Sequence, residues 1–292
     1  MAWRQYTYEL TEANRERVED ALLAAGACAV TLQAQTDEPI FEVEPSDRPL
    51  WNAIKLTALI DLSLDNDIFL LNVNAALGEA ISPSETEVIA DKDWTREWMD
   101  HFEPIQCGQR LWIVPSWHTP PAADAVNLIL DPGLAFGSGT HPTTKMCLQW
   151  LDAHIIGGEA VVDYGCGSGI LAIAALLLGA ASALACDIDP QANIATNDNA
   201  IRNNVKPDQL TNLLCDEVNS ETSADIVVAN ILANPLMGLS GTLAKMLKPG
   251  SKLVLSGILN EQAQAVIDAY QSHIQLTISN TDDGWVLLSG TK

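Results

Sequence analysis

Residues 161–169 read VVDYGCGSG, and this stretch decides the fold of the chain. It is predicted to be an apolar strand that runs into three glycines spaced two residues apart, at Gly165, Gly167 and Gly169. A strongly apolar helix is predicted to follow over residues 170–178. Glycine permits a tight turn and lets a ligand approach bare backbone. The segment therefore predicts a cofactor site at the end of a strand in an α/β sheet.

The spacing of the glycines favours one cofactor over another. A dinucleotide fingerprint reads G-x-G-x-x-G, whereas this turn reads G-x-G-x-G and residue 170 is Ile. The diphosphate of NAD needs a cradle at a helix N-terminus. S-adenosylmethionine has no phosphate and needs only a close approach for its ribose and amino-acid parts. We therefore predict S-adenosylmethionine, and the spacing disfavours an NAD oxidoreductase.

An acidic residue follows where such a site requires one. Residues 181–186 are predicted to form the next strand, which ends at Asp187, 22 residues past Gly165. A carboxylate at the tip of the second strand binds the ribose hydroxyls in such folds, because its two oxygens match two vicinal hydroxyls. The alternative is an ordinary turn in which Asp187 is only a helix N-cap.

Composition sets limits on the domain organisation and the compartment. The 292 residues suggest two domains or one enlarged α/β domain, and 48% hydrophobic residues suffice for full cores. No apolar run approaches the roughly 18 residues of a membrane span, and residues 1–5 lack signal-peptide character. None of the six cysteines form a C-x-x-C pair. We therefore expect no metal site, no disulfide framework and a location in the reducing cytoplasm.

The chain is strongly acidic, with 15 Lys and Arg against 38 Asp and Glu and a formal net charge of −23. This argues against a protein that wraps nucleic acid, since neutralising phosphates needs a Lys and Arg surface. It is compatible with a basic partner that is attracted by a negative field. The alternative that the acidity only maintains solubility stays open.

Patterning divides the chain into three parts. Residues 1–90 are predicted to have the order β-α-β-β-α-β, which is the split βαβ arrangement of ferredoxin-like modules. Residues 91–125 are predicted to be a linker helix and a connecting strand; Trp94 and Trp98 share one face of that helix and either dock it or line a ligand site. Residues 126–292 are predicted to be a parallel sheet finished by an antiparallel hairpin, with a turn over residues 247–250.

A glycine-rich loop precedes the first strand of the third part. Residues 131–144 read DPGLAFGSGTHPTT, and a helix is predicted to begin near Thr143 or Thr144. Such a loop can fold over a cofactor, and the alternative is a flexible linker. Phe136 and His141 stand out among the glycines, and His141 is either a proton acceptor or a loop-packing residue.

Four stretches together resemble the bacterial ribosomal protein L11 methyltransferase family, a class I S-adenosylmethionine-dependent family. They are DPGLAFGSGTHPTT (131–144), VVDYGCGSGILAIAALLLGA (161–180), DIDPQA (187–192) and VVANILANPL (227–236). The match runs in order from about residue 93 to the end, and residues 1–90 agree more loosely with the family's layout. The glycine loop and the Asn-Ile-Leu-Ala motif are more specific than G-x-G-x-G alone.

The resemblance implies a fold and an activity. The fold is α/β, a Rossmann-like seven-stranded methyltransferase domain (126–292) with a small N-terminal ferredoxin-like α+β domain (1–90) that recognises the substrate. The activity is S-adenosylmethionine-dependent trimethylation of lysine side chains and of the N-terminal α-amine of the large-subunit ribosomal protein L11. We expect a monomer that makes no direct contact with nucleic acid or membrane.

The family's cofactor contacts fall on residues that match its motifs. They are Thr144 in the loop, Gly165 with Gly167 in the glycine turn, Asp187 after the second strand and Asn230 after the fourth. The segment that starts at Asn230 differs from the Asn-Pro-Pro-Tyr pattern of many amino-group methyltransferases but agrees with this family. Because a sulfonium methyl group is already activated, the enzyme mainly supplies alignment. Desolvation lowers the pKa of the amine, so a dedicated base is not obligatory, and we expect Asn230 to orient the amine.

Two other function classes share parts of this pattern. A nucleic-acid N-methyltransferase shares the core fold, but the acidity and the lack of a Lys and Arg cluster weigh against it. A non-catalytic cofactor-binding module would recruit a partner without turnover. Intact Thr144, Gly165, Asp187 and Asn230 favour catalysis over that module.

Overall fold

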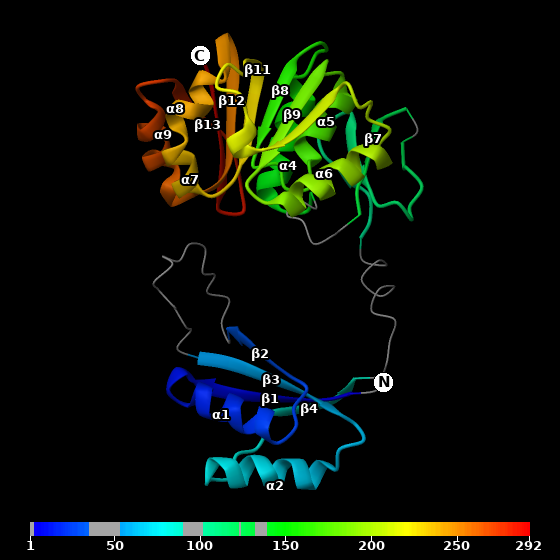
Figure 1. The fold of residues 1–292 in the computed structure, drawn as a ribbon, viewed down its shortest axis with the longest axis vertical. Coiled ribbons are helices and arrows are strands. Elements are labelled where there is room, and N and C mark those ends of the chain that lie inside the picture. The colour runs from blue at the N-terminus through cyan, green and yellow to red at the C-terminus, as the bar shows by residue number, and fades with distance from the viewer. Residues whose placement is uncertain (1–2, 35–52, 90–101, 123, 132–138) are drawn as a thin grey trace. The chain divides into compact units, whose positions relative to one another are not determined.

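The computed structural model describes residues 3–34, 53–89, 102–122, 124–131 and 139–292 (Figure 1). Its contacts divide the chain into two compact units, Met1–Met99 and Asp100–Lys292. Within the described ranges, no helix is both long and apolar enough to cross a membrane. The helix expected over residues 93–102, with Trp94 and Trp98, lies almost wholly outside the described residues. The limits of the linker remain a prediction.

The first unit has the β-α-β-β-α-β order that its sequence predicts. In chain order its elements are β1 (Trp3–Thr11), α1 (Glu12–Ala24), β2 (Ala29–Ala34), β3 (Ala53–Asp61), α2 (Asn66–Leu77) and β4 (Glu85–Ile89). The strands pair antiparallel in the order β2-β3-β1-β4. Both helices cover one face of this sheet (Figure 1). The ferredoxin-like arrangement is therefore confirmed.

Alternation of apolar side chains explains why one face of that sheet is covered. Ile54, Leu56 and Ile60 of β3 are fully buried, and they alternate with partly exposed residues. Tyr6 stacks on Phe69 of α2, with ring centroids 5.7 Å apart. The helices therefore bury the apolar face and leave the other face of the sheet polar.

The second unit is built on a seven-stranded sheet. Its strands are β8 (Ala160–Tyr164), β9 (Ser182–Asp187), β10 (Leu210–Leu214), β11 (Ala224–Asn230), β12 (Leu247–Leu259), β13 (Gln275–Asp282) and β14 (Trp285–Thr291). The order is β10-β9-β8-β11-β12-β14-β13, parallel from β10 to β12, with β14 antiparallel to both neighbours. The predicted parallel sheet with a terminal hairpin is confirmed.

Helices cover both faces of the seven-stranded sheet (Figure 1). One layer contains α4 (Pro142–His154), α5 (Ile170–Leu178) and α6 (Pro190–Arg202), and the other contains α7 (Ala233–Gly238), α8 (Ser240–Lys245) and α9 (Ala263–Tyr270). Val161 of β8 belongs to the first core and its neighbour Val162 to the second. This two-sided burial explains why the strand is a continuous apolar run.

The connectivity of this sheet fixes where a ligand site can form. From β8 the chain builds β9 and then β10 on one side, and it then crosses to β11 on the other side of β8. The loops that leave β8 and β11 therefore diverge at the carboxyl edge and open a crevice between them.

The prediction of a turn over residues 247–250 is wrong. These residues are the first part of β12. Leu247 pairs with Ala224 of β11 and Lys252 pairs with Ile226, and the register shifts between these two pairs. Gly250 has φ +81°, and its N–H donates to the carbonyl of Lys292 at 2.7 Å. A partner strand from the chain terminus thus holds a Pro-Gly segment in the sheet as a bulge.

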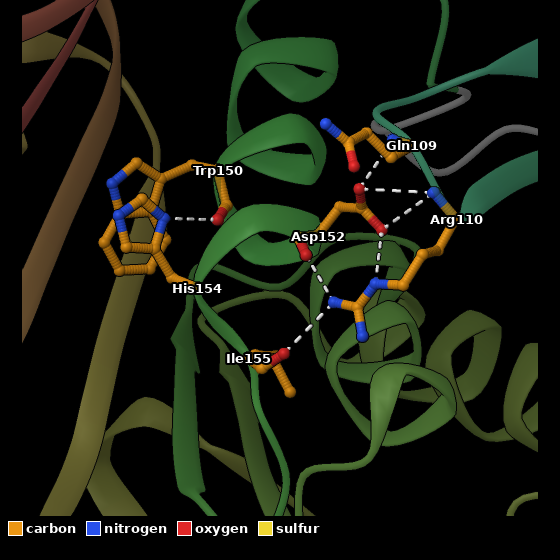
Figure 2. A network of polar contacts seen from close by, with 6 residues as sticks. All are labelled: Gln109, Arg110, Trp150, Asp152, His154 and Ile155. Carbon is orange, nitrogen blue, oxygen red and sulfur yellow. Dashed lines mark hydrogen bonds and ion pairs between the residues drawn. The ribbon is translucent and has the colours of Figure 1, made fainter.

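A small sheet is fastened to the end of α4 by a buried carboxylate. The strands β5 (Ile105–Gln106), β6 (Leu111–Val114) and β7 (Val126–Ile129) form this sheet. Asp152 accepts hydrogen bonds from the Gln109 amide at 2.6 Å and from Arg110 Nε at 3.3 Å (Figure 2). Arg110 also donates to the carbonyls of Asp152 and Ile155, so it satisfies groups that the end of α4 leaves unpaired.

Candidate functional site

A left-handed glycine turn connects β8 to α5. Gly165, Gly167 and Gly169 have φ values of +77°, +53° and +75°, which L-residues with a side chain rarely adopt. A Cβ on Gly165 would lie 2.3 Å from Cγ2 of Ile231, so the loop after β11 also excludes a side chain. Gly165 is therefore glycine for both conformational and steric reasons, and Gly167 is glycine for the conformational reason.

Asp187 is fixed against this turn. The Gly167 N–H donates to Asp187 Oδ2 at 2.9 Å, and the Asp189 N–H donates to Oδ1 at 3.1 Å. The N-cap of α6 is Asp189, which accepts from the Gln191 N–H at 2.9 Å. The alternative that Asp187 only caps that helix is therefore wrong, and its carboxylate lies at the carboxyl end of β9 beside the glycine turn.

Thr144 and Asn230 are brought together from α4 and β11. Asn230 Nδ2 donates to Thr144 Oγ1 at 3.1 Å, and Thr144 is fully buried. Asn230 Oδ1 is buried and has no hydrogen-bond partner among the described residues. A buried acceptor without a donor costs about 1–3 kcal/mol, so this oxygen is suited to a donor that arrives with a ligand.

His141 begins α4 as its N-cap. Its Nδ1 lies 2.7 Å from Thr143 Oγ1, and its ring packs edge-on against Trp285 with centroids 5.0 Å apart. Burial lowers the pKa of His141, and the Asp283 carboxylate opposes this shift. These contacts support the packing role of His141. Its role as a proton acceptor stays a prediction. Phe136 lies outside the described residues.

The sequence analysis did not single out a buried acid that lies beneath the turn. Asp163 is fully buried; its Oδ2 accepts from the Ala172 N–H at 3.0 Å, and its Oδ1 has no partner among the described residues. The N-cap Gly169 has no side chain, so Asp163 takes over the capping of α5. Burial raises the pKa of Asp163 to about 7. The signal was an acid inside an otherwise apolar strand.

The sequence analysis also did not predict the pocket next to Asp187. A cavity of about 460 Å³ lies where β8, β9 and β10 end, and it is lined by Tyr164, Ile188, Leu214, Cys215 and Asp216. Ile188 is 85% exposed, which is unusual for an isoleucine that follows a buried strand. The sequence feature that could have indicated this pocket is Asp216, an acid that follows a third strand at the same edge of the sheet.

These groups fit S-adenosylmethionine. The pocket offers the apolar face of Ile188 and the carboxylate of Asp216 to an amino-substituted ring. The adjacent Asp187 offers two acceptors to a sugar, and the glycine turn offers bare backbone to the rest of the molecule. Burial raises the pKa of the neighbouring Cys166 thiol, which disfavours a thiolate nucleophile at this turn.

The chain is similar to known methyltransferases. The profile of the family described as Ribosomal protein L11 methyltransferase (PrmA) matches residues 2–292. Relatives named ribosomal protein L11 methyltransferase are 48% identical in Pseudomonas aeruginosa (strain UCBPP-PA14) and 49% identical in Pseudomonas fluorescens (strain SBW25). The alignments cover 100% of this chain and 99% and 100% of those proteins. A crystal structure of ribosomal protein L11 methylase from Lactobacillus delbrueckii subsp. bulgaricus has 31% identity and a TM-score of 0.59, over 65% of this chain and 98% of that one.

The buried carboxyl of Asp163 predicts a pH-dependent stability. Its folded pKa of about 7 exceeds its ordinary value of 3.8, so between these values the folded state holds a proton that the unfolded state has lost. The free energy of unfolding therefore falls as the pH rises through this window, by up to about 4 kcal/mol for about three units at 1.36 kcal/mol each. Asp163→Asn keeps an acceptor for the Ala172 N–H and removes the titration.

Urea unfolding at about pH 4 and about pH 8 measures this effect. We expect the stability of Asp163→Asn relative to the wild type to increase towards pH 8. The control Asp198→Asn changes an exposed acid of α6, and its difference from the wild type should stay constant. A pH-independent difference for Asp163→Asn would show that this carboxyl has an ordinary pKa in the folded protein.

Asp187 is predicted to contribute to cofactor affinity. Asp187→Ala removes two charged acceptors next to the glycine turn, so we expect S-adenosylmethionine to bind about 10-fold to 100-fold more weakly, or on the order of 1–3 kcal/mol. Calorimetric titration measures the affinity. Asp208→Ala removes an exposed acid in the loop before β10 and should leave the affinity unchanged. Equal affinities of Asp187→Ala and the wild type would contradict the ribose assignment.

Proposed function

The chain belongs to the ribosomal protein L11 methyltransferase family, and we propose that its substrate is the amino groups of ribosomal protein L11. It is an S-adenosylmethionine-dependent methyltransferase. The observation that carries the proposal is the hydrogen bond from Asn230 to the buried Thr144. The amide oxygen of Asn230 lies at the carboxyl end of β11 and has no hydrogen-bond partner among the described residues. Ile231 follows directly and packs on Gly165, so this oxygen belongs to the same crevice as the glycine turn.

The residues that hold the cofactor in this proposal come from the ends of neighbouring strands and, for Thr144, from the first turn of α4. Asp187 binds the ribose, Gly165 and Gly167 let the amino-acid part approach the backbone, and Thr144 with Asn230 closes the crevice. When bound, S-adenosylmethionine supplies an activated methyl group on a sulfonium. The protein mainly supplies alignment of the nucleophile with that group.

The nucleophile must be a neutral amine, and this sets the task of the site. A lysine of ordinary pKa of about 10.4 needs roughly 4–5 kcal/mol to lose its proton at pH 7, whereas an α-amine of pKa of about 8 needs about 1 kcal/mol. Transfer of the amine from water into the crevice lowers its pKa and so supplies part of this free energy. A dedicated general base is therefore not required.

Asn230 orients the amine in this proposal. A neutral primary amine has two N–H hydrogens and one lone pair, and a monomethylated amine keeps one N–H. Asn230 Oδ1 is a buried acceptor without a donor among the described residues. If the oxygen accepts one N–H, the lone pair is directed away from the amide and is free to attack, so this contact orients the amine in the first two of the three methyl transfers. Thr144 holds the amide in place, because its hydroxyl oxygen accepts the Nδ2 hydrogen.

The finer description of the substrate follows the family resemblance. We propose that lysine side chains and the N-terminal α-amine are trimethylated, and that the unit formed by residues 1–90 recognises the substrate. A net charge of −23 supports a protein partner over RNA. We further propose that the enzyme acts as a monomer in the cytoplasm.

Mass spectrometry of purified L11 tests the proposed substrate. Incubation with the enzyme and S-adenosylmethionine should add multiples of about 14 Da to L11, as each methyl replaces a hydrogen, and peptide mapping should place the additions on lysines and the N-terminus. Naked ribosomal RNA in a parallel reaction should acquire no methyl groups. Methylated RNA with unmodified L11 would identify the protein as a nucleic-acid methyltransferase.

Asn230→Ala tests the orientation step. The variant removes the acceptor for the amine and the partner of Thr144, so we expect kcat to fall about 10-fold to 100-fold, which corresponds to one lost buried hydrogen bond. Calorimetry of S-adenosylmethionine on the same variant separates this effect from a loss of cofactor. Near-normal turnover would remove Asn230 from the mechanism.

A further inference from the structure

A second hollow lies at the opposite edge of the seven-stranded sheet. It has a volume of about 510 Å³ and is lined by the end of α4, the start of β12 and the hairpin of β13 and β14. The side chains that matter are those of Trp150, His154, Lys252, Gln275 and Thr291. None of the lining side chains is a carboxylate, although the chain has 38 Asp and Glu.

Lys252 supplies an unpaired positive charge to this hollow. Its Nζ lies 5.6 Å from the ring centroid of Trp150, which is a cation–π distance. No carboxylate of the described residues lies within ion-pair distance of this ammonium group. Lys248 on the same strand differs, since its Nζ is paired with Asp225 Oδ1 at 2.7 Å.

His154 adds a second nitrogen beside this charge. Its ring stacks on Trp150 with centroids 3.9 Å apart and an interplanar angle of 10° (Figure 2). Its Nδ1 lies 2.8 Å from the Trp150 carbonyl, so Nδ1 carries the hydrogen and donates it. Nε2 has no partner among the described residues, so in this tautomer it can accept the hydrogen of a P–O–H group.

The walls add neutral hydrogen-bonding groups. The Thr291 hydroxyl and the Gln275 carboxamide line the hollow, and neither makes a side-chain hydrogen bond within the described part of the chain. A point charge surrounded by neutral donors is how lysine binds phosphate oxygens. We propose that this hollow binds an oxyanion of the phosphate class, either inorganic phosphate or the phosphate of a monoester.

The site is separate from the methyl-donor crevice. Thr144 lies in the first turn of α4 and His154 is its last residue, and ten residues of helix span about 15 Å. Binding at the hollow therefore requires neither S-adenosylmethionine nor the protein substrate, and it is testable whether or not the enzyme methylates L11.

Titration with inorganic phosphate at constant ionic strength tests the proposal on the full chain. The amide resonances of Gly290 and Thr291 report on the hollow by nuclear magnetic resonance, and the titration gives a dissociation constant. We expect saturable shifts in the wild type and at least about 10-fold weaker binding in Lys252→Gln, because a charge-assisted bond is lost. The matched control Lys248→Gln should bind within about 2-fold of the wild type, since that ammonium is already paired.

Two arms distinguish the sources of the phosphate. Tighter binding of a phosphate monoester such as glycerol 3-phosphate than of inorganic phosphate identifies an ester as the ligand, and the reverse order identifies the free ion. Absence of saturable shifts in the wild type, or equal weakening by Lys252→Gln and Lys248→Gln, would overturn the proposal. His154→Gln gives a second reading, because it keeps Lys252 and should weaken binding by a smaller factor.

Discussion

The hydrogen bond from the Gly167 amide to Asp187 is the contact on which the proposed cofactor site depends. It joins the loop after β8 to the end of β9, and it forms only because the glycine turn is left-handed and aims this amide at the neighbouring strand. The carbonyls of the same turn are held from α6, where Thr196 donates to Gly167 and Asn199 donates to Ser168. These contacts fix the turn from two sides. Because the turn has glycines on its open side, a ligand can approach the backbone there.

Charge acts on this enzyme at two length scales. Over long distances a net charge of −23 attracts a protonated amine. In the proposed reaction only the neutral amine can attack, so burial in the crevice must remove the proton that the distant field favoured. Asn230 is suited to this change because an uncharged amide oxygen accepts from a neutral amine without holding its proton as a carboxylate would. The acids nearest the turn are occupied differently: Asp187 accepts from two backbone amides, and Asp163 is buried under α5.

Much of the fold and part of the site could be predicted from the sequence because local patterns report them. The glycines, the apolar strands and the acid after β9 each occur in one short segment. The first unit has the predicted succession of elements, and the second has the predicted parallel strands followed by an antiparallel hairpin. The Thr144–Asn230 pair is separated by 86 residues, and only the family resemblance placed both in one site. The pocket near Asp216 and the contact between Arg110 and Asp152 also depend on tertiary contacts. Such contacts leave no periodic pattern in the sequence, so they could not be predicted from it. Residues 247–250 had turn composition, but pairing with β11 and Lys292 overrode it.

A crystal structure of this enzyme grown with S-adenosylhomocysteine tests the central claim most directly. We expect the base in the pocket of Ile188 and Asp216, and the ribose hydroxyls within about 3.2 Å of the Asp187 carboxylate oxygens. We also expect the sulfur to be directed towards Asn230. Electron density for the ligand at any other place, or a ribose that makes no hydrogen bond to Asp187, would contradict it.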